Sequence, residues 1–169
     1  MRFTSGCSKS KAFMLSRRYF EDFKVGEIWE SPPVVVTAEE IVAFAREFDP
    51  QPMHTDAARA ADGPFKALVA SGWHVTAISW REFHRAGGYG STPVVGLGAD
   101  ELRWHRPVKA GDAVRVRREV IELRLSASNP AQGIVRTRVS MRNQSDEVVM
   151  TLLSAGRVPS RLAADGGHE

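Results

Sequence analysis

The segment 48–56 carries the side chains best suited to chemistry in this sequence. Asp49 and His54 stand five residues apart, and Pro50 and Pro52 stiffen the chain between them. Histidine changes its protonation state readily near neutral pH, and a neighbouring carboxylate can orient the ring or share acid–base work with it. The pair therefore predicts a site at which a carboxylate and an imidazole share one water molecule.

On spacing alone, a structural interpretation of the same residues is the commoner one. Asp49 and Asp56 would then cap helices, and His54 would fill a polar niche. A metal site needs more ligands than His54 and Asp56 supply, and no other histidine lies four residues away on a helix. No metal is therefore expected. Three further histidines are interpreted as packing or surface residues: His74, His84 and His105.

Asp49 must be positioned by the helix expected before it. Thr37 and Glu40 form a capping box, which predicts that this helix begins at Thr37. An apolar stripe follows at i, i+3, i+4 and i+7, made of Ile41, Phe44, Ala45 and Phe48. Pro50 disfavours the helical conformation of the residue before it, so the helix should end at Asp49.

A second set of signals follows His54. Thr55 or Asp56 can cap a short helical turn over 57–61. The pattern is helical again over 67–86, and Gly87 with its neighbouring glycine supplies the stop. The apolar face of this longest helix is predicted to contain Leu68, Val69, Trp73, Ala77 and Trp80.

The chain after the glycine-rich turn at 87–90 is typical of strands. They are predicted over 94–104, 113–123, 134–141 and 148–158, with an earlier strand over 28–36 that two prolines interrupt. Apolar and polar residues alternate along them, as in half-buried antiparallel strands. A long helix followed by four such strands predicts an α+β domain in which one antiparallel sheet wraps the main helix.

Length and composition fit one domain. The 169 residues include 43% hydrophobic and 25% charged residues, as in an ordinary globular chain. We expect the domain to span 19–158, between a disordered leader over 1–18 and a flexible tail over 159–169. No apolar run approaches the ~20 residues that cross a bilayer, so no membrane association is expected. The lone Cys7 cannot form an internal disulfide, which fits a reducing cytoplasm.

Charge alone does not select a partner, because the net charge is only +3. Between Arg103 and Arg138, nine Lys or Arg residues stand against three acidic ones. We expect most of them to form a solvated face of the sheet, some of which would contact the phosphates of a phosphate-bearing ligand. Few aromatic residues interleave with this run, which disfavours binding of single-stranded nucleic acid, and no nucleic-acid partner is expected.

Three ordered motifs resemble the MaoC-like acyl dehydratases, a group that includes the R-specific enoyl-CoA hydratases. They are the loop 49–56, the segment 70–74 and the turn 102–112 with its Pro-Val-x-x-Gly-Asp pattern. The similarity runs from about Tyr19 to Arg157. It implies a single hot-dog fold, in which an antiparallel sheet is wrapped around a long central helix.

The resemblance also implies roles for individual residues. Asp49 and His54 correspond to the catalytic pair that activates water, and the backbone N–H of Gly72 binds the thioester oxygen at the start of the central helix. Three further residues are expected to contact the substrate: Gln51, Ser71 and Trp73. The chain departs from the family at Gln51, where asparagine is usual, and at Ala77, where some members have serine. Trp73, Trp80 and Trp104 are interpreted as core residues or acyl-pocket walls.

The implied reaction is the reversible hydration of a trans-2-enoyl-CoA, with coenzyme A favoured over acyl carrier protein. It needs no metal or redox cofactor, because acid–base work and oxyanion stabilisation can supply the rate. Two alternatives stay open: a hot-dog thioesterase, and a module that binds acyl-CoA without turnover. The exposed edge of one hot-dog sheet further implies a homodimer or a dimer of dimers.

Overall fold

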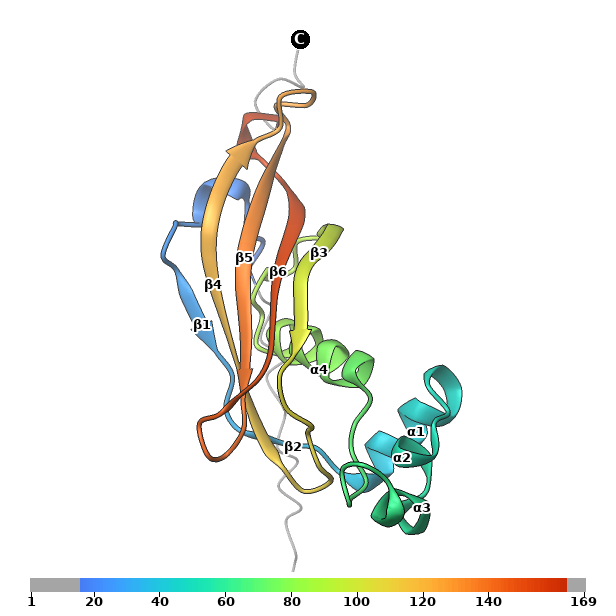
Figure 1. Cartoon of the computed structure of the whole chain (residues 1–169). Coiled ribbons are helices and arrows are strands. Elements are labelled where there is room, and N and C mark those ends of the chain that lie inside the picture. Colours follow the sequence, from blue (N-terminus) through green and yellow to red (C-terminus); the bar gives the residue numbers. More distant parts are fainter. Residues whose placement is uncertain (1–15, 164–169) are drawn as a thin grey trace, which may run out of the picture.

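The computed structural model describes residues 16–163 and contains one antiparallel sheet with a long helix against one face (Figure 1). Its strands are β1 (Ile28–Glu30), β2 (Val34–Val35), β3 (Val95–Trp104), β4 (Ala113–Leu125), β5 (Gln132–Arg142) and β6 (Val148–Pro159). They lie in the order β1-β4-β5-β6-β3, and β2 pairs with β4. The predicted strands are therefore confirmed, with the two prolines at 32–33 separating β1 from β2.

The helices form two groups. A compact group of three lies beyond one end of the sheet, and α4 (Gly72–Arg85) lies along the sheet (Figure 1). The group of three consists of α1 (Ala38–Phe48), α2 (Pro52–Thr55) and α3 (Ala57–Asp62). Two single 3₁₀ turns lie near the two ends of the described chain, η1 (Phe20–Asp22) and η2 (Arg161–Ala163). In the part of the chain that the structure describes, no helix is long and apolar enough to cross a membrane.

Both ends of the described chain are attached to the domain near η1. Arg17 forms a β-bridge with Gly90, and Nη2 of Arg18 lies 2.8 Å from Oε1 of Glu27. At the other end, Nη2 of Arg161 lies 2.8 Å from Oδ2 of Asp22. Residues 1–15 of the predicted leader, which include Cys7, and residues 164–169 of the predicted tail lie outside the described residues.

Helix α1 begins and ends where the sequence predicts. The hydroxyl of Thr37 accepts a hydrogen bond from the backbone N–H of Glu40 at 3.2 Å. The capping box is not reciprocal, because the Glu40 carboxylate instead pairs with Arg81 of α4 at 2.9 Å. Ile41 and Ala45 are buried, whereas Phe48 is 63% exposed at the end of the helix. The predicted stripe is thus wrong at Phe48, which lines the pocket described below.

Helix α4 begins at Gly72, five residues later than the helical pattern predicts and at the glycine that the family resemblance places there. The segment before it is extended instead: Val69 forms a β-bridge with Lys109, and the N–H of Ala70 donates to the carbonyl of Val108 at 2.8 Å. An apolar run such as 67–70 fits a helix or a strand equally well, and this long-range pairing decides for the strand.

The buried face of α4 also differs from the predicted one. Trp73 is 58% exposed and Ala77 is exposed, although the apolar face predicted from the helical pattern contains both. The buried face consists of His74, Val75, Ile78, Ser79, Glu82 and Phe83. It contains several polar residues, so the apolar stripe in the sequence does not mark the side of the helix that meets the sheet.

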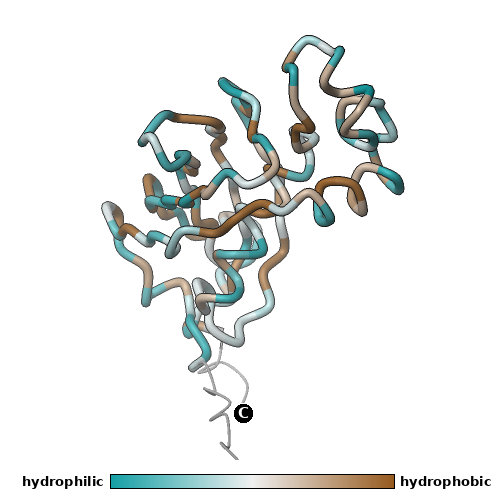
Figure 2. The backbone as a smooth tube through the Cα atoms, turned by 90° about the horizontal axis from the view of Figure 1, so that it is seen from below, coloured by the Kyte–Doolittle hydropathy of each residue, from teal (hydrophilic) through white to brown (hydrophobic). Residues whose placement is uncertain are grey.

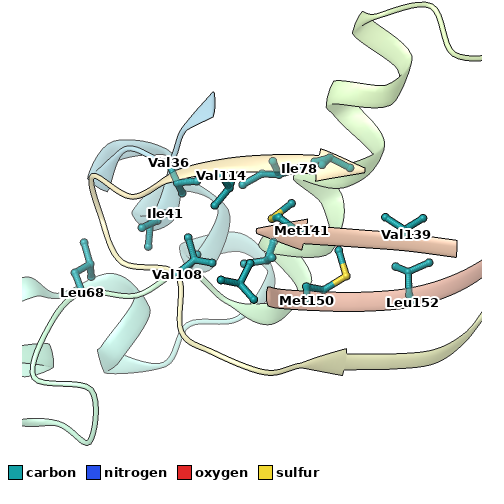
Figure 3. Close-up of a cluster of buried hydrophobic side chains, with 14 of the residues drawn as sticks. Val36, Ile41, Leu68, Ile78, Val108, Val114, Val139, Met141, Met150 and Leu152 are labelled. Carbon is teal, nitrogen blue, oxygen red and sulfur yellow. The ribbon is translucent and has the colours of Figure 1, made fainter. Parts of the chain in front are cut away.

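The main core lies between α4, α1 and the inward side of the sheet (Figure 3). Ile78 of α4 and Ile41 of α1 meet strand residues such as Val114, Met141 and Met150, all of them almost fully buried. Hydrophobic and hydrophilic residues interchange over short distances along the chain (Figure 2), as half-buried strands require. This core holds the ends of α1 and α4 in a fixed relation.

The predicted basic face of the sheet carries acidic partners. Arg117 lies 2.9 Å from Glu119, and Arg136 lies 3.2 Å from Glu122. Arg118 is different, because it is buried, with its guanidinium over the rings of Trp80 and Phe83 at 4.6 and 4.3 Å. The positive charge expected on the surface is therefore partly paired and partly buried.

Candidate active site

Asp49 and His54 are brought together by two consecutive short elements. Asp49 is the C-cap of α1, and His54 lies in α2, which begins at Pro52. Oδ2 of Asp49 lies 3.6 Å from Nε2 of His54. The ring of His54 is buried, whereas Asp49 is partly exposed. The predicted pair therefore forms in the structure, with one carboxylate oxygen facing one imidazole nitrogen.

The orientation of the His54 ring is fixed by a backbone contact. Nδ1 lies 2.7 Å from the carbonyl oxygen of Val69. A carbonyl only accepts hydrogen bonds, so Nδ1 must carry the proton. In the neutral ring, Nε2 then holds a lone pair that points toward Asp49. A water molecule between the two groups would have an acceptor on each side.

Asp49 receives two hydrogen bonds from side chains. The hydroxyl of Ser71 donates to Oδ2 at 2.6 Å, and the amide of Gln51 donates to Oδ1 at 2.8 Å. These bonds lower the pKa of the Asp49 carboxyl, and the bond from Ser71 has the larger effect. Partial burial of the carboxyl opposes this shift, and His54 adds a smaller lowering effect. Asp49 is therefore a carboxylate at neutral pH.

The first turn of α4 faces the same space. Gly72 is its first residue, and a Cβ atom at this position would lie 2.5 Å from ring atoms of Trp104. The indole N–H of Trp104 donates to Oγ1 of Thr76 at 3.2 Å, which holds the ring against the helix. Only glycine allows this approach, and its N–H, which has no partner within the helix, lies at the start of α4 in the same pocket as Asp49.

These groups line a pocket of about 490 Å³. Five of the six predicted site residues line it: Asp49, Gln51, His54, Gly72 and Trp73. Ser71 does not, because it is fully buried behind Asp49. Its only proton is donated to Asp49, its oxygen accepts the N–H of Trp73, and the residue is fully buried, so Ser71 presents no exposed polar atom for the expected contact with substrate.

Several lining residues were missed by the sequence reasoning. They include Phe48, Met53, Phe65, His105 and Arg106. The histidine was interpreted as a packing or surface residue; its Nε2 lies 2.8 Å from the hydroxyl of Thr151 while its ring lines the pocket. Its place in the 102–112 motif was the available signal. Trp104 lines the pocket, whereas Trp80 packs in the core.

Comparisons with known proteins agree with this geometry. The family model described as MaoC like domain matches residues 23–143. A MaoC-like dehydratase structure from Rhodospirillum rubrum is 36% identical, with a TM-score of 0.74 over 85% of this chain and 98% of that one. The structure of R-hydratase PhaJ1 from Pseudomonas aeruginosa is 28% identical, with a TM-score of 0.67 over 84% of this chain and 86% of that one.

A curated relative is also similar over most of its length. The 3-hydroxyacyl-thioester dehydratase Z of Mycobacterium tuberculosis is 28% identical over 121 residues, which cover 70% of this chain and 80% of that protein. Together with the structural matches, this similarity confirms the α+β hot-dog fold that the motifs predict.

Proposed function

Because this chain belongs to the family of MaoC-like dehydratases, we propose that it is a hydro-lyase that hydrates the double bond of a trans-2-enoyl-CoA reversibly. The observation that carries the proposal is the separation of 3.6 Å between Oδ2 of Asp49 and Nε2 of His54, in a pocket that the first turn of α4 also lines. Two relatives that the comparisons identify are named for hydration or dehydration.

In the proposed reaction, Asp49 and His54 are the catalytic residues. A water molecule donates its two hydrogens to Oδ2 of Asp49 and Nε2 of His54, and its oxygen attacks C3 of the enoyl group. One water proton passes to the pair as the C3–O bond forms, and the π electrons of the C2=C3 bond move into the thioester. The pair then returns one proton to C2, so that water is added and the enzyme is regenerated.

Gly72 stabilises the charge that develops on the thioester oxygen during this reaction. Its backbone N–H stands at the positive end of α4 and has no partner within the helix. A donor in this position binds an oxyanion more strongly than a neutral carbonyl, which favours the enolate over the ground state. The reaction as proposed uses only protons and hydrogen bonds, so it needs no metal or redox cofactor.

The edge strand β3 supports a homodimer as part of this proposal. Strand β3 ends the sheet and is exposed along almost its whole length, with Val95 at 58%, Leu97 at 42% and Trp104 at 45% exposure. Apolar residues on an unpaired edge favour pairing with a second copy. The mass in solution, measured by light scattering, should be that of two chains or a multiple of two.

Product analysis separates hydration from hydrolysis, the alternative that keeps the same fold. The protein is mixed with trans-2-enoyl-CoA thioesters of short, medium and branched acyl chains, and loss of the conjugated absorbance is followed beside release of free thiol. Hydration removes the absorbance without free thiol and yields 3-hydroxyacyl-CoA. Thiol release at the same rate would identify a thioesterase instead, and binding without either change would identify a non-catalytic acyl-CoA-binding protein.

A further inference from the structure

Ser71 contacts the candidate catalytic carboxylate although it is not exposed to the pocket. Its side chain is fully buried, its hydroxyl donates to Oδ2 of Asp49 at 2.6 Å, and the same oxygen accepts the N–H of Trp73 at 3.2 Å. A serine hydroxyl has one proton, and a carboxylate can only accept, so the direction of the bond to Asp49 is fixed. One hydroxyl thus joins the end of α1 to the beginning of α4.

We propose that Ser71 is a positioning residue, whose hydroxyl aims Oδ2 of Asp49 at Nε2 of His54 and fixes the carboxylate relative to the N–H of Gly72. This proposal rests on the proposed function for its catalytic meaning. Asp49 lies at the end of α1 and Gly72 at the start of α4, and the bond between Ser71 and Asp49 joins residues that are 22 positions apart in the sequence. Small displacements at such a site are costly, because the reacting groups must stay aligned.

The geometry distinguishes positioning from the two other roles that a serine in a site can have. Ser71 does not line the pocket, whereas Asp49, Gln51 and Gly72 do. A nucleophilic serine needs an exposed oxygen and a base that takes its proton, and here the oxygen is covered. A substrate-binding serine needs a donor or acceptor that faces the pocket, whereas the proton of Ser71 is donated to Asp49 and its oxygen is fully buried.

The two donors to Asp49 also divide its oxygens between them. Gln51 holds Oδ1 from the exposed side, and Ser71 holds Oδ2 from the buried side. Only Oδ2 faces His54, so the bond from Ser71 acts on the oxygen that would accept a proton from water. Removing the Ser71 hydroxyl should leave the Asp49 carboxylate held by Gln51 alone and should destabilise its charged form.

A titration that does not depend on turnover tests this directly. The carboxyl carbon of Asp49 is followed by NMR in protein labelled at aspartate, with Asp49→Asn used to assign the signal. In Ser71→Ala, the pKa of Asp49 should move upward relative to the wild type. An unchanged titration in this variant would overturn the proposal.

Thr37→Ala is the matched control, because it removes the hydroxyl that caps the N-terminus of α1, as Ser71 caps α4, without removing a bond to Asp49. Both caps contribute to stability, so both variants should unfold at lower temperature. Only the Ser71 variant should shift the titration of Asp49.

Ser71→Gly provides a second variant, since glycine is tolerated at an N-cap but lacks the hydroxyl. If neither variant folds, an ordinary or raised pKa for Asp49 in the wild type would contradict the proposal.

Kinetics then connects the bond to the reaction. With an enoyl-CoA substrate, Ser71→Ala should lower kcat by roughly ten- to a hundredfold, leave KM nearly unchanged and move the acid limb of kcat/KM to higher pH. Ser71→Thr, which keeps the hydroxyl, should restore the position of that limb. A raised KM with an unchanged acid limb would mean that Ser71 contacts substrate. If the NMR shift occurs in a protein that hydrates no thioester, the proposed function fails while the role of Ser71 toward Asp49 stands.

Discussion

The imidazole of His54 approaches Asp49 with Nε2, at 3.6 Å from Oδ2, while its other nitrogen is bound to a backbone carbonyl. The two contacts assign different tasks to the two nitrogens. Nδ1 fixes the ring to Val69, and Nε2 is left for chemistry. Structural and chemical contributions of this side chain can therefore be separated by substitution.

Replacing His54 with asparagine or glutamine separates these contributions. The amide of His54→Asn can take the place of Nδ1 and donate to the carbonyl of Val69, whereas the amide of His54→Gln reaches toward the place of Nε2. Because neither amide can take a proton, both variants should lose about 10²–10⁴-fold in turnover. The asparagine variant should keep a melting temperature nearer to the wild type. Equal activity in either variant would show that His54 is not an acid–base group.

Gly72→Ala should distort the pocket, because the added methyl group clashes with the ring of Trp104. The added methyl group would lie 2.5 Å from the indole of Trp104, which must then move into the pocket. We expect loss of most activity in the single variant, measured with the same thioester. The double variant Gly72→Ala with Trp104→Ala tests the cause, because it removes the clash and keeps the backbone N–H. Activity that stays as low in the double variant as in the single one would show that the clash is not the reason.

Trp104 should restrict the size of the acyl group. Its ring is held by Thr76 and meets Trp73 edge-on, with the ring centroids 5.3 Å apart. Trp104→Ala removes one wall of the pocket, so kcat/KM for long or branched enoyl thioesters should rise relative to that for short ones. Trp104→Phe serves as the control and should keep the wild-type order of preference. A rank order unchanged by the alanine substitution would place the acyl chain elsewhere.

His74 should make the fold sensitive to acid. Its ring is buried and stacks on Phe44, with centroids 4.8 Å apart. Burial, opposed by the carboxylate of Glu40 and assisted by the cation of Arg81, lowers the pKa of His74 from its usual 6.5. Below that pH the unfolded chain binds a proton that the folded chain resists, so stability falls as the pH decreases toward the lowered pKa.

Thermal unfolding across pH checks this expectation. His74→Leu should flatten the loss of melting temperature between about pH 7 and pH 5, because it removes the titrating group. His105→Leu replaces a more exposed histidine and should keep the wild-type slope. The same slope in His74→Leu as in the wild type would assign the acid sensitivity to other groups.

The sequence was sufficient where local signals decide the structure. Thr37 and Pro50 mark the two ends of α1, so the position of Asp49 follows from its neighbours. Strand alternation likewise predicts β4, β5 and β6 within two residues at each end. The proximity of Asp49 and His54 was predictable because both residues stand on one short segment.

Long-range contacts decide what the sequence left open. The extended conformation of 68–70 depends on pairing with 108–110, which no local pattern shows. The bond between Ser71 and Asp49 depends on where α4 begins, so the helical pattern, which starts at 67, could not reveal it. For Trp73, the helical pattern favoured the core and the family resemblance favoured the pocket, and the structure decides for the pocket.

In the proposed function, Asp49 and His54 together add water to an enoyl thioester. The most direct test compares wild type, Asp49→Asn and His54→Asn on the preferred trans-2-enoyl-CoA, by loss of the conjugated absorbance and by mass of the product. We predict a gain of one water by the substrate with the wild-type protein, and a loss of about 10²–10⁴-fold in each variant that remains folded. Turnover that survives both substitutions, or a folded wild-type protein that leaves every enoyl thioester unchanged, would contradict the account.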